Sequence, residues 1–258
     1  MKITKHIPNL ITCLNLFCGI LACIAALRGD ATTTFGLLVL AALFDFCDGL
    51  MARLLNAYSP MGKELDSLAD LISFGLAPGF LTFSLLQHIT AASSHSLVTA
   101  YVPYVAFMIP VFSALRLAKF NIDDRQTNSF IGMPTPANAM FWVSFALSVS
   151  ISAHMVSYKN AFIVGLVSDW YRWIGSGPHW SIIAGLVIIF SLLLVSEISM
   201  FSLKFKSMKW SDNQSTYLFM ILSAVLIVLF GAFGITLVIA SYILFSLFTH
   251  LYTNKQPK

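Results

Sequence analysis

The run Leu10–Leu27 reads LITCLNLFCGILACIAAL and contains no charged residue. A helix rises about 1.5 Å per residue, so about 20 consecutive apolar residues are needed to cross the ~30 Å of hydrocarbon in a bilayer. Similar apolar runs recur along the whole chain of 258 residues. No cleavage site of the A-x-A type follows the first run, so we expect it to be a retained span and not a signal peptide. The run therefore predicts an integral membrane protein.

The composition leads to the same class. Hydrophobic residues make up 58% of the chain and charged residues only 10%, with a mean hydropathy of +0.82. A soluble domain carries roughly a quarter charged residues. The net charge of +4 comes from basic residues scattered between apolar runs, without interleaved aromatic stacking positions, so no nucleic-acid partner is predicted. The predicted partner is the lipid bilayer.

Eight helical spans are predicted, at 9–28, 33–56, 65–88, 97–121, 135–154, 180–203, 215–231 and 233–252. The aromatic-rich segment 159–179 is expected to be an interfacial loop on the outer side, with a ninth short span as the alternative. We expect an all-α polytopic bundle that forms a single domain over residues 1–258.

The distribution of basic residues predicts the orientation, because cytoplasmic loops carry an excess of Lys and Arg. With a cytoplasmic N-terminus and an even number of spans, the outer side receives only Arg28, Lys159 and Arg172 of the 15 basic residues. The cytoplasmic side receives Lys2, Lys5, Arg53, Lys63, Arg116, Lys119, Arg125, Lys204, Lys206, Lys209, Lys255 and Lys258. Both termini are therefore predicted to be cytoplasmic. The protein itself is predicted to lie in the inner (cytoplasmic) membrane.

Acidic residues gather in the second and third predicted spans, where burying a charge is costly. Two stretches hold them, DFCDGLMAR at 45–53 and GKELDSLAD at 62–70. Asp45 and Asp48 lie about 60° apart on one helix face, and Asp66 and Asp70 are one helical turn apart on the next helix. The short connection makes the two helices antiparallel neighbours, so the two acidic stripes can face each other.

Four carboxylates in one cleft must be neutralised, and three interpretations compete. The acids could be protonated or paired with Arg53 and Lys63; they could line an ion or proton pathway of a transporter; or they could bind a divalent cation such as Mg²⁺ or Mn²⁺. Gly49, Ala52 and Gly62 leave the helix faces bare beside the acids, which gives a bulky phosphate substrate room to approach. This favours the metal site.

Residues 45–70 also match the pattern D-x2-D-G-x2-A-R-x8-G-x3-D-x3-D without a gap, and the chain thereby resembles the CDP-alcohol phosphotransferase family. Such enzymes transfer a phospho-alcohol group from a CDP-linked donor to an acceptor hydroxyl and release CMP. The resemblance implies a homodimer and two divalent cations, with metal ligands at Asp45, Asp48, Asp66 and Asp70. It implies that Asp70 is a metal ligand, the general base, or both. The nucleotide-diphosphate pocket would be lined by Gly49, Ala52, Arg53 and Gly62.

Three further stretches resemble the bacterial membrane-integral phosphatidylserine synthases of that family. They are IPNLIT at 7–12 with NLFCG at 15–19, ELDSLAD at 64–70 with SFGLAP at 73–78, and RLAKFN at 116–121 with FIGMPTPA at 130–137. The resemblance covers roughly the first 140 residues. It implies CDP-diacylglycerol and L-serine as substrates, and phosphatidylserine and CMP as products.

The polar residues at the cytoplasmic ends of the predicted spans are candidates for binding the nucleotide and the acceptor. Asn9 and Thr12 could cap the first helix or donate to the nucleotide. Candidate acceptor-binding residues end the fourth span, namely Arg116, Lys119 and Asn121, although basic residues there also anchor a helix at the membrane surface. The acceptor hydroxyl needs a positioned base, for which Asp70 is the candidate. A cytoplasmic cleft would let a water-soluble acceptor meet the lipid donor.

Two other functions stay open. A sibling enzyme could use glycerol phosphate or inositol phosphate, but a phosphorylated acceptor should demand an additional basic cluster, and only Arg116, Lys119 and Arg125 are available. A cation or proton transporter could use the same intramembrane acids. Transport gives no reason for the spacing of Gly49 and Ala52.

Overall fold

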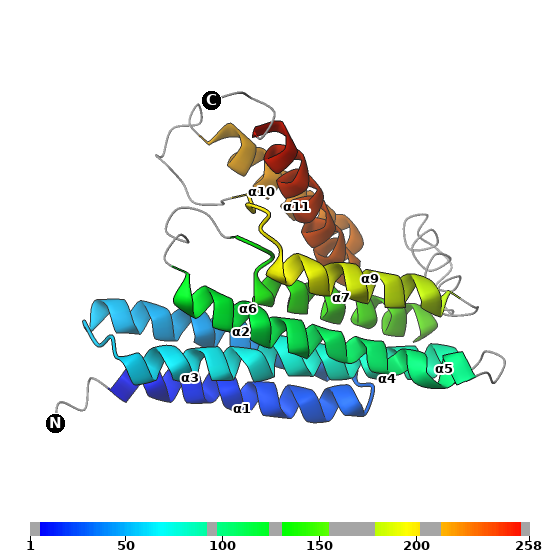
Figure 1. The fold of residues 1–258 in the computed structure, drawn as a ribbon, viewed down its shortest axis with the longest axis horizontal. Helices are drawn as coiled ribbons and strands as arrows, with labels where there is room; N and C mark the ends of the chain where they lie inside the picture. The colour runs from blue at the N-terminus through cyan, green and yellow to red at the C-terminus, as the bar shows by residue number, and fades with distance from the viewer. Residues whose placement is uncertain (1–5, 92–96, 124–130, 155–178, 202–212, 254–258) are drawn as a thin grey trace.

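The computed structural model describes residues 6–91, 97–123, 131–154, 179–201 and 213–253 (Figure 1). Within these ranges the regular elements are helices, and the β-structure is limited to one isolated bridge between Ile131 and Ser199. The helices are α1 Ile7–Leu27, α2 Ala31–Leu54, α3 Pro60–Asp70, η2 Leu71–Leu76, α4 Ala77–Ala91, α5 Leu97–Tyr101, η3 Val102–Phe107, α6 Met108–Ile122, α7 Thr135–His154, α9 Trp180–Val195, α10 Gln214–Phe230 and α11 Ala232–Thr253. The predicted all-α class is confirmed.

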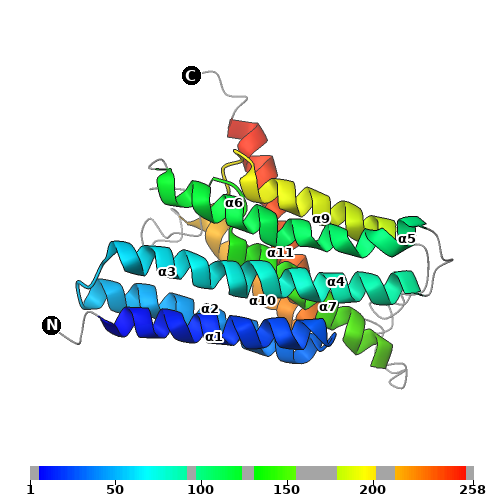
Figure 2. The same cartoon turned by 60° about the horizontal axis from the view of Figure 1, so that its bottom comes forward.

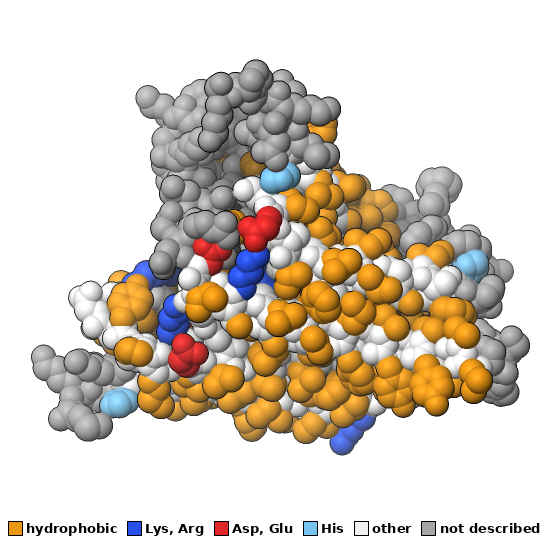
Figure 3. All heavy atoms as spheres, viewed as in Figure 1, with side chains coloured by type: hydrophobic (Ala, Val, Ile, Leu, Met, Phe, Trp, Pro, Cys, Tyr) orange, Lys and Arg blue, Asp and Glu red, His pale blue; other side chains and the backbone are white. Residues whose placement is uncertain are grey.

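Five helical segments in the described part of the chain are long and apolar enough to cross a membrane. They are Ile7–Leu27, Ala31–Leu54, Pro60–Ala91, Leu97–Ile122 and Ala232–His250. The helices α9 and α10 are also apolar but shorter. Hydrophobic side chains cover most of the face drawn in Figure 3, which suits contact with lipid. The chain is a multi-pass membrane protein. The number of eight spans and the cytoplasmic location of both termini stay predictions. Most of the predicted outer loop, residues 155–178, lies outside the described residues.

The first helices lie side by side and alternate in direction, as Figures 1 and 2 show. The connection between α2 and α3 therefore lies at the same end of the bundle as the start of α1. At the opposite end Asp30 caps α2 by accepting a 3.0 Å hydrogen bond from the Thr33 N–H. Hydrogen bonds from the Thr33 side chain and backbone hold the pKa of Asp30 below its usual value. This alternation brings both acidic stretches to one end.

The prediction that a span covers 180–203 is wrong at its C-terminal end. Helix α9 ends at Val195, and Ser196 is extended, with ψ 156°. The chain then runs beside the entry to α7, where Gly132 N–H donates to Ile198 O at 2.9 Å. Gly132 has φ +76°, and a Cβ there would lie 2.6 Å from Leu194 O, so this close backbone approach requires glycine. The contact fixes the start of α7 against the end of α9.

The third membrane segment, Pro60–Ala91, contains a π-helical stretch directly after Asp70, η2 Leu71–Leu76. Such segments are uncommon and are frequently found at functional sites. Gly19 of α1 packs against it, because a Cβ on Gly19 would lie only 2.9 Å from Ser73 Cα. The small residue thus lets α1 approach the π-helical backbone just beyond the last aspartate of the motif.

Candidate active site

Three aspartates meet between α2 and α3, as their spacing predicts. Asp45 and Asp48 on α2 and Asp66 on α3 each offer a carboxylate oxygen, and these oxygens all lie within 4.8 Å of one another. Asp70 lies outside this group of three, although its carboxyl interacts with that of Asp45. Instead, Asp70 Oδ1 accepts a 3.2 Å hydrogen bond from Asn15 Nδ2 on α1. The four aspartates are therefore divided into a group of three and one held by an amide.

No basic side chain in the described part of the chain forms an ion pair with these acids. Arg53 Nε donates to Gly49 O at 3.1 Å in its own helix, and Lys63 Nζ donates to Asn121 O at 2.8 Å. Arg53 and Lys63 therefore do not pair with the acids, and the interpretation that they neutralise the cluster is not supported.

The oxygen atoms of the cluster suit a hard divalent cation. Thr12 Oγ1 donates to Asp48 Oδ2 at 2.6 Å. Asp66 Oδ1 is buried and has no hydrogen-bond partner among the described residues. A buried carboxylate oxygen without a partner is costly unless a cation or a proton satisfies it. Carboxylate oxygens are the ligands that Mg²⁺ and Mn²⁺ prefer, so the donor set fits such a cation.

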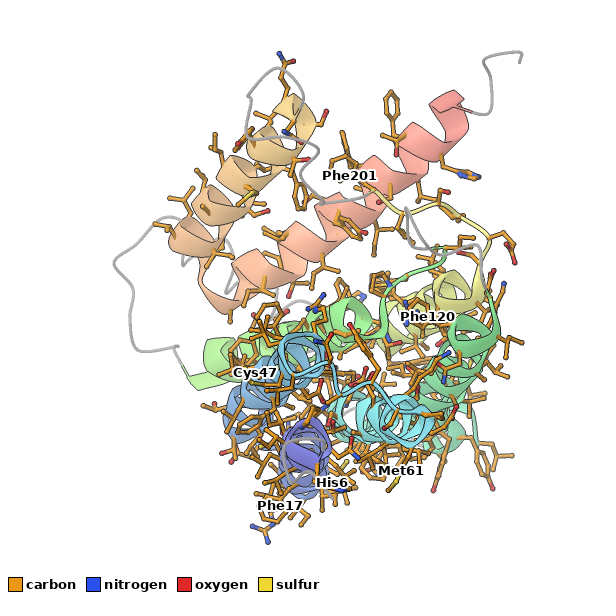
Figure 4. The ribbon with its side chains drawn as sticks, turned by 90° about the vertical axis from the view of Figure 1, so that its left-hand side faces the viewer. His6, Phe17, Cys47, Met61, Phe120 and Phe201 are labelled. Carbon is orange, nitrogen blue, oxygen red and sulfur yellow. The ribbon has the colours of Figure 1, made fainter. Side chains whose placement is uncertain are left out.

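A cavity of about 520 Å³ opens beside the cluster. Figure 4 looks at this end of the bundle, where His6 marks the start of α1 and Met61 the start of α3. The lining residues are Pro8, Asn9, Thr12, Asp48, Gly49, Ala52, Ala57, Tyr58, Ser59, Pro60, Gly62, Lys63 and Asp66. Five of the six residues predicted to bind the nucleotide, Asn9, Thr12, Gly49, Ala52 and Gly62, thus line one cavity together with two of the aspartates.

The two glycines of the motif do different things. A Cβ on Gly62 would lie 3.0 Å from Ser59 Oγ and 3.1 Å from Asn9 Oδ1, so this glycine lets α1 approach α3. A Cβ on Gly49 would meet no atom of another described element within 4 Å, although Gly49 lines the cavity. Packing within the described part of the chain therefore does not require a glycine at position 49, whereas a molecule in the cavity could.

Some of the predictions for the site residues are wrong or incomplete. Helix α1 begins at Ile7, and its N-cap residue His6 forms no side-chain capping bond, so the prediction that Asn9 or Thr12 caps this helix is wrong. Arg53 does not line the cavity. Sequence reasoning missed Tyr58 at the cavity wall, and it assigned no role to Asn15. An amide side chain within the apolar run 10–27 was the available signal for Asn15.

Arg116 is buried near the last aspartate. Its side chain is 7% exposed, its Nη1 donates to Thr135 Oγ1 at 3.2 Å, and its guanidinium lies 5.3 Å from the centre of the Phe120 ring. Arg116 is also within electrostatic range of Asp70. Its Nε is buried without a hydrogen-bond partner among the described residues, which leaves a donor for a bound molecule.

The other two candidate acceptor residues are engaged elsewhere. Lys119 forms an ion pair with Glu197, which follows the end of α9, and its Nζ lies 3.4 Å from Val195 O. Asn121 Nδ2 donates to Ser67 Oγ at 2.9 Å and so ties α6 to α3. Of the three residues predicted to bind the acceptor, Arg116 is the one that interacts electrostatically with Asp70.

Comparisons with known proteins agree with this geometry. The chain is 38% identical over 140 residues to a Bacillus subtilis protein named CDP-diacylglycerol–serine O-phosphatidyltransferase, a match covering 53% of this chain and 72% of that protein. Proteins of the same name from Methanocaldococcus jannaschii and Helicobacter pylori are 32% and 29% identical, over 62% and 79% of this chain and 69% and 74% of theirs. The model of the CDP-alcohol phosphatidyltransferase family matches residues 5–174, about two thirds of the chain. The chain belongs to the CDP-alcohol phosphatidyltransferase family.

Proposed function

We propose that this chain transfers the phosphatidyl group of CDP-diacylglycerol to the hydroxyl of L-serine and releases CMP. The observation that carries the proposal is the group of three carboxylates, two of which, Asp48 and Asp66, line a cavity of about 520 Å³. That cavity is large enough for a substantial part of a nucleotide diphosphate, and Gly49 in its wall has no side chain that would occupy it. The serine acceptor is supported by the names of the relatives.

Two divalent cations, Mg²⁺ or Mn²⁺, are part of the proposal. Asp45, Asp48 and Asp66 would hold them, with Asp70 as a further ligand on its free side. When bound, the cations would neutralise the charge on the diphosphate and on the transferred phosphoryl group. The orphaned Asp66 Oδ1 supports this assignment, because it needs a partner that the described protein groups do not supply.

The residues of the chain would then act on the acceptor. The serine hydroxyl oxygen attacks the lipid-bearing phosphorus, and the bond from that phosphorus to the CMP oxygen breaks, so that CMP leaves with the electron pair. The hydroxyl proton passes to the Asp70 carboxylate. Arg116 would bind the serine carboxylate, since its buried guanidinium retains an unused Nε–H within electrostatic range of Asp70.

The proposed site faces the cytoplasm, in a homodimer embedded in the inner (cytoplasmic) membrane. Charged side chains gather toward the site end of the face drawn in Figure 3. Lys63 and Lys119 lie at that end, on α3 and α6, whereas Arg28 follows α1 at the opposite end. This asymmetry agrees with the excess of basic residues on the cytoplasmic side of membrane proteins.

A phosphorylated acceptor is the second candidate, and the charges argue against it. Glycerol phosphate or inositol phosphate would bring close to two negative charges into the site. Lys119 is paired with Glu197 and Arg125 lies outside the described residues, so Arg116 is the buried cation near Asp70 in the described part of the chain. One guanidinium matches the single carboxylate of serine.

The deciding assay uses purified protein in lipid nanodiscs with CDP-diacylglycerol, Mn²⁺ and radiolabelled serine, with glycerol phosphate and inositol phosphate as competing acceptors. We expect label in lipid from serine and equimolar release of CMP. Label from a phosphorylated acceptor instead would move the chain to a sibling activity. Failure with every alcohol, together with ion flux in proteoliposomes that lack CDP-diacylglycerol, would establish the transporter alternative.

Gly49→Ala should weaken donor binding without harming the fold. The added methyl group meets no atom of another described element within 4 Å, at a position that lines the cavity. We expect the KM for CDP-diacylglycerol to rise roughly tenfold, while the unfolding temperature stays or rises, because alanine favours a helix by about 1 kcal/mol over glycine. Gly36→Ala is the matched control, since it lies on the same helix and a Cβ there is equally free of contacts. Equal KM values for both variants would contradict a donor in this cavity.

Arg116→Lys should impair acceptor binding selectively. Lysine keeps the charge but loses the planar fork that contacts Thr135 and presents the unused Nε–H. We expect the KM for serine to rise about tenfold, which corresponds to ~1.4 kcal/mol. The KM for CDP-diacylglycerol, measured in the same steady-state series, should change less than about twofold. A larger effect on the donor than on serine would contradict the assignment.

A further inference from the structure

We propose that Asn15 is a positioning residue that holds Asp70 apart from the group of three aspartates, and that Ser73 fixes the orientation of the Asn15 amide. The proposal rests on the proposed function, because it assigns Asp70 the role of base. It concerns residues outside the 45–70 motif, contributed by α1 and by the π-helical segment η2.

The hydrogen bonds form a directed chain. Ser73 Oγ lies 2.7 Å from Asn15 Oδ1 and donates to it, and Asn15 Nδ2 donates to Asp70 Oδ1 at 3.2 Å. Because an ionised Asp70 carboxylate can only accept, the amide nitrogen faces Asp70 and the amide oxygen is left to accept from the Ser73 hydroxyl. Asn15 and Ser73 are both 0% exposed, so water does not compete for these bonds. The orientation of Asn15 is thus set by its partners on both sides.

The packing around this chain leaves little freedom. Gly19 follows Asn15 by one helical turn, and Ser73 Cα lies so close to it that a Cβ on Gly19 would be 2.9 Å away. Ser73 Oγ is also 3.1 Å from the backbone oxygen of Asn15. The π-helical segment begins at Leu71, directly after Asp70, so the aspartate and Ser73 belong to one continuous helix held against α1.

The consequence is that Asp70 and the group of three aspartates have different roles. The amide occupies Asp70 Oδ1 and leaves the other oxygen of this carboxyl for the acceptor proton or for a cation. An amide carries no charge, so it orients Asp70 without competing with cations for the negative charge, as a lysine or arginine would. This explains how the last aspartate stays outside the group formed by Asp45, Asp48 and Asp66 although it touches Asp45.

The test compares Asn15→Leu and Ser73→Ala in the purified full-length protein, with release of CMP as the readout for the acceptor that the wild type uses. Leucine fills a similar volume without a donor, and Ser73 can still donate to the backbone oxygen of residue 15. We expect kcat to fall about 30- to 100-fold in Asn15→Leu and about three- to tenfold in Ser73→Ala, since a small misplacement of a reacting group is costly. The KM for CDP-diacylglycerol and the Mn²⁺ concentration for half-maximal rate should stay within about threefold.

Cys23→Ala is the matched control, because Cys23 also reaches from α1 to η2, 3.9 Å from Ile72 O, without contacting Asp70. Its kcat should stay within about twofold of the wild type. The proposal is overturned if Asn15→Leu keeps its kcat, or if its KM and Mn²⁺ requirement worsen as much as its kcat. Should Asn15→Leu fail to give a monodisperse peak in size-exclusion chromatography, an unchanged kcat in Ser73→Ala overturns it equally. A wild type that transfers to no alcohol would instead refute the proposed function.

Discussion

Replacing Asp66 with asparagine should lower metal-dependent transfer on the order of 10³-fold and, at the same time, stabilise the metal-free protein. Loss of one ligand from the group of three removes several kcal/mol of charge stabilisation from the transition state, and each ~1.4 kcal/mol is a factor of ten in rate. Without metal, the same substitution relieves repulsion between partly buried acids. Its amide group can also donate to a neighbouring carboxylate, where Asp66 Oδ1 has no partner among the described residues.

Activity and stability should therefore move in opposite directions. Both are measured on one preparation, by release of CMP and by thermal unfolding with and without Mn²⁺. The wild type should gain about 2.7 kcal/mol of stability at a Mn²⁺ concentration 100 times the Kd, and Asp66→Asn should gain much less. Glu64→Gln is the control, because it makes the same change of charge on an exposed position of the same helix. The metal site would be refuted if Asp66→Asn were active, or if Mn²⁺ did not change the unfolding temperature of the wild type.

The membrane helices were predictable because their signal is local. An apolar run of sufficient length specifies a buried or lipid-facing helix whatever it packs against, and each predicted span contains a helix in the described part of the chain. The end of α9 was not predictable in this way. Half of the residues 196–203 are apolar, and this stretch includes no glycine or proline that would end a helix. The helix stops there as the chain pairs with Gly132, a contact that no local pattern encodes.

The same distinction separates the parts of the site. The meeting of Asp45, Asp48 and Asp66 follows from helical periodicity and a short turn, so the spacing was sufficient. The separate place of Asp70 depends on a π-helical segment and on a side chain from α1, and regular periodicity predicts neither. The ion pair of Lys119 with Glu197 joins residues 78 positions apart, so no local pattern predicts it, and a role of Lys119 in acceptor binding stays a prediction.

Asp70→Asn should retain binding of CDP-diacylglycerol and lose turnover. Asparagine preserves the shape of the side chain but cannot accept the acceptor proton, so we expect kcat to fall about 10²- to 10⁴-fold. The Kd for CDP-diacylglycerol, measured by calorimetry with Mn²⁺ in nanodiscs, should change less than about threefold, because the group of three aspartates remains intact. Turnover like that of the wild type would exclude Asp70 as the base, and a parallel loss of binding would make it chiefly a metal ligand.

The double variant with Asn15→Leu gives the sharper result. If Asn15 acts only by holding Asp70, its substitution has nothing left to disturb once the carboxylate is gone. The two losses in kcat should then fail to add, and Asp70→Asn with Asn15→Leu should be as slow as Asp70→Asn alone, within about threefold. Full additivity of the two free energies would mean that Asn15 supports the site through another route, such as the packing of α1 against η2. Non-additivity would tie both residues to a single proton-accepting unit.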